Sequence, residues 1–271
     1  MISARPQRSA LEVRWKILTG ATAVGVMATI AVLALRPAEP PVPAAVATTS
    51  AAKPGAPADG PDAASLAPAE QKLPGAWVDQ APPKADPNRP LVLGLHGRGD
   101  SAGNFAAIAG RLGPDLTWRF LEAPLPWREN TQWFRMDAPD GGRSDLEQAA
   151  QLVEAHVRSA KNRKVALVGF SQGCFLAAHY AATRPDSVAA VLCIGGGLVY
   201  PPEVPASRHK PAILFVHGLE DRVIPTARGR DARQVLENRG LPSEWLEHAE
   251  GHVVPESEVG RMRAWLESHL R

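Results

Sequence analysis

The stretch VALVGFSQGCFLAAH, at residues 165–179, constrains the fold more than any other part of the sequence. Its first half is a short apolar run, typical of a strand buried on both faces, and its second half has helical spacing. Ser171 lies between them, flanked by Gly169 and Gly173 at positions where a side chain would crowd the strand or the helix. A strand that passes into a helix through so tight a turn predicts one unit of a helix-covered, mostly parallel sheet.

The same alternation continues through the C-terminal part of the chain. Apolar runs predict strands at 91–95, 117–123, 164–170, 187–194, 211–218 and 243–250. Helical spacing follows at 102–112, 145–160, 172–183, 226–239 and 256–270. Ser144 and Glu147 have the spacing of a capping box at the start of the second helix. The pattern predicts an α/β fold with helices on both faces of the sheet.

The N-terminal part has a different composition. Residues 17–35 form an uncharged apolar run, which as a helix spans roughly 28 Å, close to the thickness of a bilayer core. More Lys and Arg precede the run than follow it, which predicts a cytoplasmic N-terminus. We expect residues 1–36 to form a transmembrane signal anchor; a cleaved signal peptide, followed by secretion, is the alternative.

Residues 37–75 are rich in alanine and proline and lack hydrophobic periodicity, which predicts a disordered linker. Residues 76–271 are then the folded domain. The net charge of +2 gives no indication of nucleic-acid binding. Cys174 and Cys193 both lie in apolar runs without metal-ligand spacing, so we expect two buried free thiols rather than a disulfide.

Ser171 occupies the nucleophile position of a G-x-S-x-G turn, at the carboxyl end of a strand and the start of a helix. A serine hydroxyl needs a base to remove its proton, and the base needs an acid to orient it. The loop after the strand at 211–218 offers Glu220 and Asp221 as the acid. His252 follows the last strand in a loop and is the expected base, whereas His248 lies within the strand pattern.

The tetrahedral intermediate of such a reaction also needs hydrogen-bond donors for its oxyanion. One is the backbone N–H of the residue after the nucleophile, which is Gln172. The other is expected from the loop HGRGD at 96–100, where glycines allow the backbone to approach a substrate.

The ordered motifs LHGRGD, WF, GFSQG, HGLEDRVIP and GHVVPE resemble the carboxylesterase/phospholipase family of α/β-hydrolases, which includes acyl-protein thioesterases. The resemblance covers about residues 90–271. It implies an α/β-hydrolase fold and a triad of Ser171, His252 and Asp221, with Asp221 rather than Glu220 as the acid. It also implies that the second oxyanion donor is the backbone N–H of Arg98. Members of the family hydrolyse carboxylic esters or thioesters without a metal or an organic cofactor.

The sequence departs from the family pattern at three positions. Arg98 stands where leucine is usual, which predicts a cation at the rim of the acyl site. Arg135 replaces an aspartate after the WF pair, and Cys174 replaces a glycine after SQG. The segment at 124–143 is long for a loop, which is typical of functional loops. Its Trp127, Trp133 and Phe134 are predicted to form an acyl-binding wall; the alternative is that they cover the core beneath a long loop.

Together these patterns predict a bacterial inner-membrane serine carboxylesterase, with its domain in the periplasm and a small-molecule or lipid ester as its substrate. One alternative is a lysophospholipase or acyl thioesterase that acts on membrane-derived lipids. An esterase of a cell-wall polymer is another. A catalytically silent binding module with the same fold is an alternative of a different class.

Overall fold

The computed structural model describes residues 73–82, 86 and 88–271. The predicted anchor at 17–35 and most of the predicted linker lie outside these residues. Among the helices in the described part of the chain, none is both long and apolar enough to cross a membrane.

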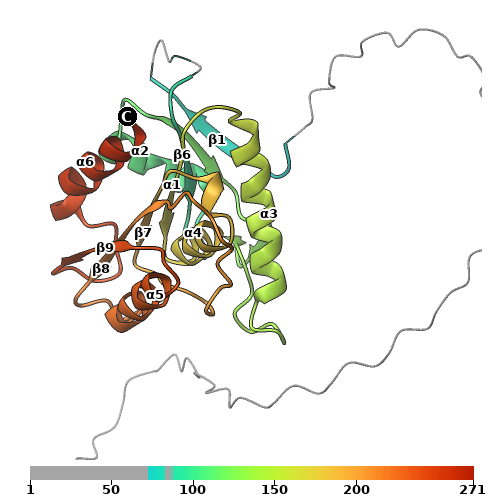
Figure 1. Ribbon diagram of the computed structural model, residues 1–271. Helices are drawn as coiled ribbons and strands as arrows, with labels where there is room; N and C mark the ends of the chain where they lie inside the picture. Colours follow the sequence, from blue (N-terminus) through green and yellow to red (C-terminus); the bar gives the residue numbers. More distant parts are fainter. Residues whose placement is uncertain (1–72, 83–85, 87) are drawn as a thin grey trace, which may run out of the picture. The chain divides into compact units, whose positions relative to one another are not determined.

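A seven-stranded sheet forms the centre of the fold (Figure 1). Its strands are β1 (Trp77–Gln80), β2 (Leu91–Leu95), β3 (Thr117–Leu121), β6 (Val165–Phe170), β7 (Ala190–Ile194), β8 (Ala212–Gly218) and β9 (Ser243–His248). They lie in the order β1-β3-β2-β6-β7-β8-β9, and all neighbours are parallel except β1, which pairs antiparallel with β3. The six parallel strands are those that the apolar runs predict. Strand β1 was not predicted, because an edge strand with three exposed residues has no apolar run.

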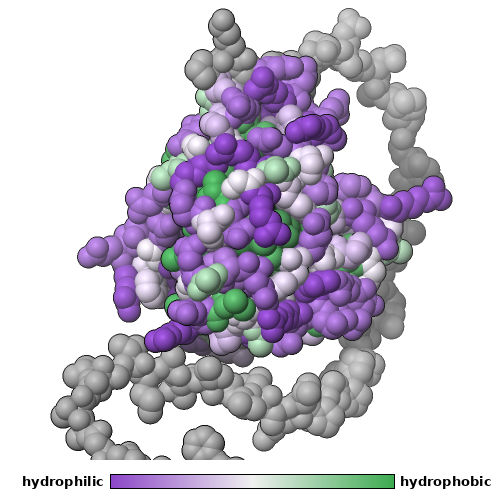
Figure 2. Space-filling view, turned by 90° about the vertical axis from the view of Figure 1, so that its left-hand side faces the viewer, coloured by the Kyte–Doolittle hydropathy of each residue, from purple (hydrophilic) through white to green (hydrophobic). Residues whose placement is uncertain are grey.

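Helices cover both faces of the sheet, as predicted. One face packs against α3 (Arg143–Ser159), α4 (Gln172–Thr183) and α5 (Thr226–Asn238). The other packs against α1 (Ala102–Phe105), η1 (Ala106–Ile108), α2 (Ala109–Leu112) and α6 (Val259–Leu270). Short 3₁₀ turns, η2 (Pro185–Ser187) and η3 (Glu256–Glu258), complete the domain. Strands β2 and β7 are buried along their whole length because both of their faces are covered. On the face in Figure 2, hydrophobic residues form only small patches among hydrophilic ones.

The start of α3 differs from the prediction. Gly142, at a φ of 79°, is the N-cap, and neither Ser144 nor Glu147 forms a capping box. The carboxylate of Asp140 accepts the backbone N–H of Gly142 at 2.9 Å and that of Ser144 at 2.8 Å. These hydrogen bonds, chiefly those from Ser144, lower the pKa of Asp140 to about 2. The prediction is wrong because an aspartate in the preceding turn satisfies the first amides of the helix.

The expectation of two free thiols is also wrong. Cys174 and Cys193 form a disulfide, with their Cα atoms 4.7 Å apart. Cys174 lies in the first turn of α4, which packs against β7, and Cys193 is a residue of β7. The helix thus passes close enough to the strand for a bond that joins residues 19 apart in the chain. The disulfide ties the helix that follows Ser171 to the neighbouring strand.

The segment at 124–143 is not one irregular loop. It contains a hairpin of β4 (Leu125–Trp127) and β5 (Asn130–Gln132), paired antiparallel. Thr131 of this hairpin also forms an isolated β-bridge with Asp100. The hairpin therefore lies beside the loop that follows β2.

Candidate active site

Three loops at the carboxyl edge of the sheet bring together Ser171, Asp221 and His252. Ser171 follows β6, Asp221 follows β8, and His252 follows β9. His252 Nε2 lies 2.9 Å from Ser171 Oγ, and His252 Nδ1 lies 2.7 Å from Asp221 Oδ2. The side chains thus form one continuous hydrogen-bonded chain from hydroxyl to carboxylate.

Ser171 occupies a strained turn between β6 and α4. Its backbone has a φ of 52° and a ψ of −117°, a region that few residues other than glycine adopt. A Cβ atom on Gly169 would collide with Gly173 O, and one on Gly173 would collide with Leu95 O. The two glycines therefore let α4 begin directly against the strands, and this close packing holds Ser171 at the sharp corner.

Of the two neighbouring candidates for the acid, Asp221 contacts His252, whereas the side chain of Glu220 is exposed. The carboxylate of Asp221 is fully buried. Its Oδ1 accepts the backbone N–H groups of Val223 at 2.9 Å and Ile224 at 2.8 Å, while Oδ2 faces His252. These donors satisfy a buried negative charge and fix the orientation of the carboxylate.

His252 has the hydrogen-bond partners that a general base requires. With a carboxylate at Nδ1, the proton resides on that nitrogen, so Nε2 is free to accept the hydroxyl proton of Ser171. The ring packs on Phe170, with centroids 4.9 Å apart. A Cβ atom on Gly195 would come within 3.3 Å of its Nδ1 and Cε1. By contrast, His248 is buried within β9, and burial lowers its pKa.

The predicted oxyanion donors belong to the residue after Ser171 and to a loop that contacts Ser171. Gln172 is the first residue of α4, so its backbone N–H has no partner within the helix. Gly97 touches the serine closely enough that an added Cβ would lie 3.4 Å from Ser171 Cβ, and Arg98 follows it. The next amide, that of Gly99, donates to Thr131 O at 2.8 Å. No hydrogen bond within the described residues uses the backbone N–H of Arg98.

Trp133 lies beneath this loop. It is fully buried, and its Nε1 donates to His96 O at 2.8 Å. The structure thus places Trp133 where the alternative interpretation has it, in the core under the loop. The neighbouring Phe134 is also buried.

The contacts of the Gln172 side chain were not predicted from the sequence. Its Oε1 accepts the backbone N–H of Trp133 at 2.7 Å, and its Nε2 donates to Phe134 O at 2.7 Å. The side-chain amide of Gln172 thus pairs with the backbone of residues 133–134 as a neighbouring strand would. Because Trp133 contacts the HGRGD loop, these hydrogen bonds connect that loop to the start of α4.

His96 braces the same loop, as its position before a glycine suggests. It is fully buried, and its Nε2 accepts the backbone N–H of Ala123 at 3.2 Å. Its Nδ1 lies 2.8 Å from Gly97 O. His217, near the end of β8, makes a similar contact: its Nε2 lies 2.8 Å from Ile224 O. This contact stabilises the loop that carries Asp221.

Arg135, one of the departures from the family pattern, forms an ion pair with Asp145. Its guanidinium contacts both carboxylate oxygens of Asp145, at 2.8 and 2.9 Å, and its backbone N–H donates to the same carboxylate at 3.0 Å. Asp145 is buried, and the hydrogen bond from Arg135 lowers its pKa. This pair joins the end of the WF segment to the start of α3.

Solved structures of esterases share this fold. Acyl-protein thioesterase 2 of Zea mays superposes with a TM-score of 0.60 at 21% sequence identity, over 73% of this chain and 100% of that one. Esterase PE8 gives a TM-score of 0.63 at 24% identity, over 73% of this chain and 100% of its own. At these identities the likeness shows the fold.

Similarity in sequence leads to the same group of proteins. Carboxylesterase SOBER1 of Arabidopsis thaliana is 23% identical over 209 residues, which cover 68% of this chain and 92% of that protein. A probable inactive carboxylesterase of Oryza sativa subsp. japonica is 27% identical over 213 residues, covering 68% of this chain and 86% of its own. Residues 80–270 match the model of the phospholipase/carboxylesterase family. The chain therefore belongs to the phospholipase/carboxylesterase family of α/β-hydrolases.

Proposed function

We propose that this protein is a serine carboxylic ester hydrolase that works through an acyl-enzyme. The observation that carries the proposal is the hydrogen-bonded chain Ser171–His252–Asp221. The backbone N–H groups of Arg98 and Gln172, which donate no hydrogen bond within the described residues, support it. A binding domain with this fold has no need for a buried carboxylate aligned on a histidine. Since a relative of the chain is described as inactive, the presence of all three side chains bears on activity more than family membership does.

In the acylation step, Ser171 Oγ attacks the ester carbonyl carbon as His252 Nε2 removes its proton. The buried carboxylate of Asp221 stabilises the imidazolium that forms. The carbonyl oxygen becomes an oxyanion and accepts hydrogen bonds from the backbone N–H groups of Arg98 and Gln172. When the C–O bond breaks, His252 gives its proton to the departing alcohol.

Deacylation repeats the same steps with water. His252 removes a proton from water as the water oxygen attacks the acyl carbon, and the same two N–H groups stabilise the second oxyanion. His252 then returns the proton to Ser171 Oγ, and the carboxylic acid leaves. Every proton in the cycle passes through Nε2, the nitrogen that faces the serine.

A lysophospholipase or acyl thioesterase activity is the second candidate. Three large hydrophobic side chains within two residues of Asp221 or His252 in the sequence are exposed: Leu219 at 56%, Val223 at 64% and Val253 at 43%. Apolar side chains at the mouth of a site favour substrates with a long acyl chain. The reaction is the same, with a lysophospholipid or a thioester as the acyl donor.

Labelling with a fluorophosphonate probe tests the proposal. The full chain, purified in an ester-free detergent, is expected to be labelled and to hydrolyse p-nitrophenyl esters, and Ser171→Ala is expected to do neither. A ladder of acyl chain lengths then separates small-ester from lipid-like substrates. A folded protein that is neither labelled nor active would instead support the binding module.

We also propose that the domain works in the bacterial periplasm, attached to the inner membrane by residues 17–35. The apolar run with its preceding basic residues supports the anchor, and the Cys174–Cys193 disulfide supports an oxidising compartment. An alkaline phosphatase fusion after residue 75 is expected to be active, and the protein is expected to fractionate with membranes at its full mass of 28.9 kDa. Recovery of a shorter, soluble form would support signal cleavage and secretion.

A further inference from the structure

One aromatic side chain near the proposed oxyanion site lies against two arginines. The ring centroid of Trp127 is 5.1 Å from Cζ of Arg98 and 4.4 Å from Cζ of Arg128. Trp127 itself packs on the HGRGD loop, since a Cβ atom on Gly99 would lie 2.5 Å from its Cζ3. We call Arg98, Trp127 and Arg128 the arginine–tryptophan cluster. The loop on which the cluster packs also carries Gly97, whose added Cβ would lie 3.4 Å from Ser171 Cβ.

The Arg98 side chain is held in place, although it is exposed. The ring of Trp127 contacts its guanidinium on one side, and its Nη1 donates to Met136 Sδ at 3.6 Å. A thioether is a weak acceptor and carries no charge. Most of the donors of the guanidinium therefore remain available, in an orientation that the hairpin sets.

Among the described residues, no carboxylate forms an ion pair with either arginine of the cluster. Other arginines of the domain have acidic partners: Arg119 pairs with Asp79, Arg135 with Asp145 and Arg184 with Glu147. In the part of the chain that the structure describes, Arg98 and Arg128 take part in no such pair. Arg98 directly follows Gly97, whose added Cβ would lie 3.4 Å from Ser171 Cβ, and Arg128 lies on the ring of Trp127 that packs on the same loop.

We propose that the arginine–tryptophan cluster selects esters that carry a negative charge, a carboxylate or a phosphate, close to the scissile carbonyl. This inference rests on the proposed function and specifies its substrate class. A substrate whose oxyanion binds the N–H of Arg98 brings its neighbouring atoms within reach of the side chain of the same residue. A guanidinium with free donors binds carboxylate and phosphate oxygens through paired hydrogen bonds.

The charge can belong to the acyl part or to the alcohol, and two pairs of substrates separate these sources. The first compares p-nitrophenyl esters of glutaric acid and of its monoamide, and the second compares butyrate esters of 3-hydroxybenzoate and 3-hydroxybenzamide. Within each pair, a carboxylate is exchanged for a carboxamide of the same shape. We expect about a tenfold higher kcat/KM for the anionic member of one pair at low salt, and a smaller ratio in about 0.5 M NaCl, where salt screens exposed charges.

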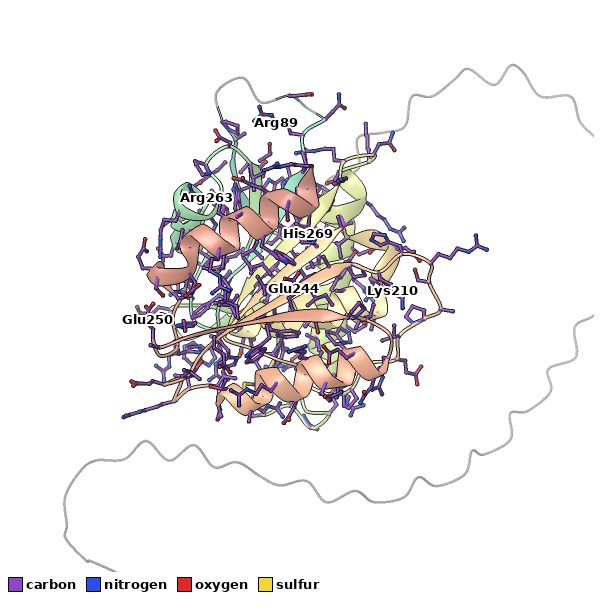
Figure 3. All side chains as sticks on the ribbon, turned by 60° about the vertical axis from the view of Figure 1, so that its left-hand side comes forward. Arg89, Lys210, Glu244, Glu250, Arg263 and His269 are labelled. Atoms are coloured by element: carbon purple, nitrogen blue, oxygen red, sulfur yellow. A yellow bond between two sulfur atoms is a disulfide. The ribbon has the colours of Figure 1, made fainter. Side chains whose placement is uncertain are left out.

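The variants Arg98→Leu and Arg128→Leu identify the source of the preference. Arg98→Leu keeps the backbone N–H and is expected to abolish the preference, so that the ratio of kcat/KM between the anionic member of the pair and its carboxamide falls to about one. Arg128→Leu is expected to reduce the preference in part. The matched control is Arg208→Leu, which removes an arginine in the loop before β8, at the amino end of that strand. Figure 3 shows that Lys210, in the same loop, and Glu250, in the loop after β9, lie on opposite sides of the molecule. The control arginine thus belongs to a loop that is distant from the carboxyl edge of the sheet.

Equal kcat/KM values within both pairs would overturn the inference and leave the proposed function intact. So would a preference that persists in Arg98→Leu. A protein without Ser171-dependent turnover of any of the four substrates, and without fluorophosphonate labelling, would refute the proposed function and the inference together.

Discussion

Replacing Asp221 by asparagine tests the link between the buried carboxylate and the reactivity of Ser171. The side-chain oxygen of the asparagine would still accept the N–H groups of Val223 and Ile224, which now lie 2.9 and 2.8 Å from Oδ1 of the aspartate. The NH₂ group would then face His252 Nδ1, where a carboxylate oxygen now lies at 2.7 Å. Two donors cannot share this contact, so the imidazole must carry its proton on Nε2 instead.

In that tautomer, Nε2–H points at the Ser171 oxygen, which lies 2.9 Å away, and the serine loses the acceptor for its proton. We expect kcat to fall by about 10⁴-fold, the loss typical of a base held in the wrong tautomer. This corresponds to about 5.5 kcal/mol in activation free energy. The unfolding free energy is expected to change by at most about 3 kcal/mol, because only one charged hydrogen bond is lost.

The assay measures steady-state hydrolysis of a p-nitrophenyl ester, with urea unfolding as the stability readout. Glu220→Gln is the matched control, since it makes the same chemical change at the exposed neighbouring residue and is expected to retain full activity. A loss of less than tenfold in Asp221→Asn, in a folded protein, would refute the role of the carboxylate. A large loss in Glu220→Gln alone would move the acid to that residue.

Three further predictions concern contacts that support the site. Replacing both cysteines in Cys174→Ala/Cys193→Ala removes the crosslink over 19 residues and is expected to lower the unfolding free energy by about 3 kcal/mol, measured by urea unfolding; an unchanged midpoint would contradict a formed disulfide. Trp133→Ala is expected to destabilise the protein by about 3–5 kcal/mol with an unaltered preference among acyl chain lengths, because the ring is buried; a shifted preference would restore the acyl-wall hypothesis. The stability advantage of the parent over Asp145→Asn is expected to be constant at neutral pH and to shrink as pH falls below 3.8, the ordinary carboxyl pKa. Arg135 lowers the pKa of Asp145 in the folded state, so its contribution is present above the unfolded pKa and is lost as pH falls through the folded one; an advantage independent of acid pH would refute the pair.

The amino-acid sequence by itself determined the succession of parallel strands and helices along the chain. It also determined the candidates for the triad. These features depend on local pattern. An apolar run of strand length, a glycine-flanked serine and a helical repeat within residues 165–179 predict a strand, a sharp turn and a helix without knowledge of any distant contact. The acid and the histidine follow in the loops after later strands, and parallel strands bring their carboxyl ends to one edge.

Tertiary structure decided what depends on residues far apart in the chain. Burial and two backbone N–H groups distinguish Asp221 from Glu220, two carboxylates that are adjacent in sequence. The disulfide forms because the start of α4 packs against β7. The apolar residues around a cysteine do not reveal whether a second cysteine packs against it, so the sequence could not distinguish a disulfide from two free thiols. Trp127 contacts Arg98 only because the β4–β5 hairpin packs against the HGRGD loop. Local pattern specifies which elements form, but the close approach of two side chains depends on how those elements pack.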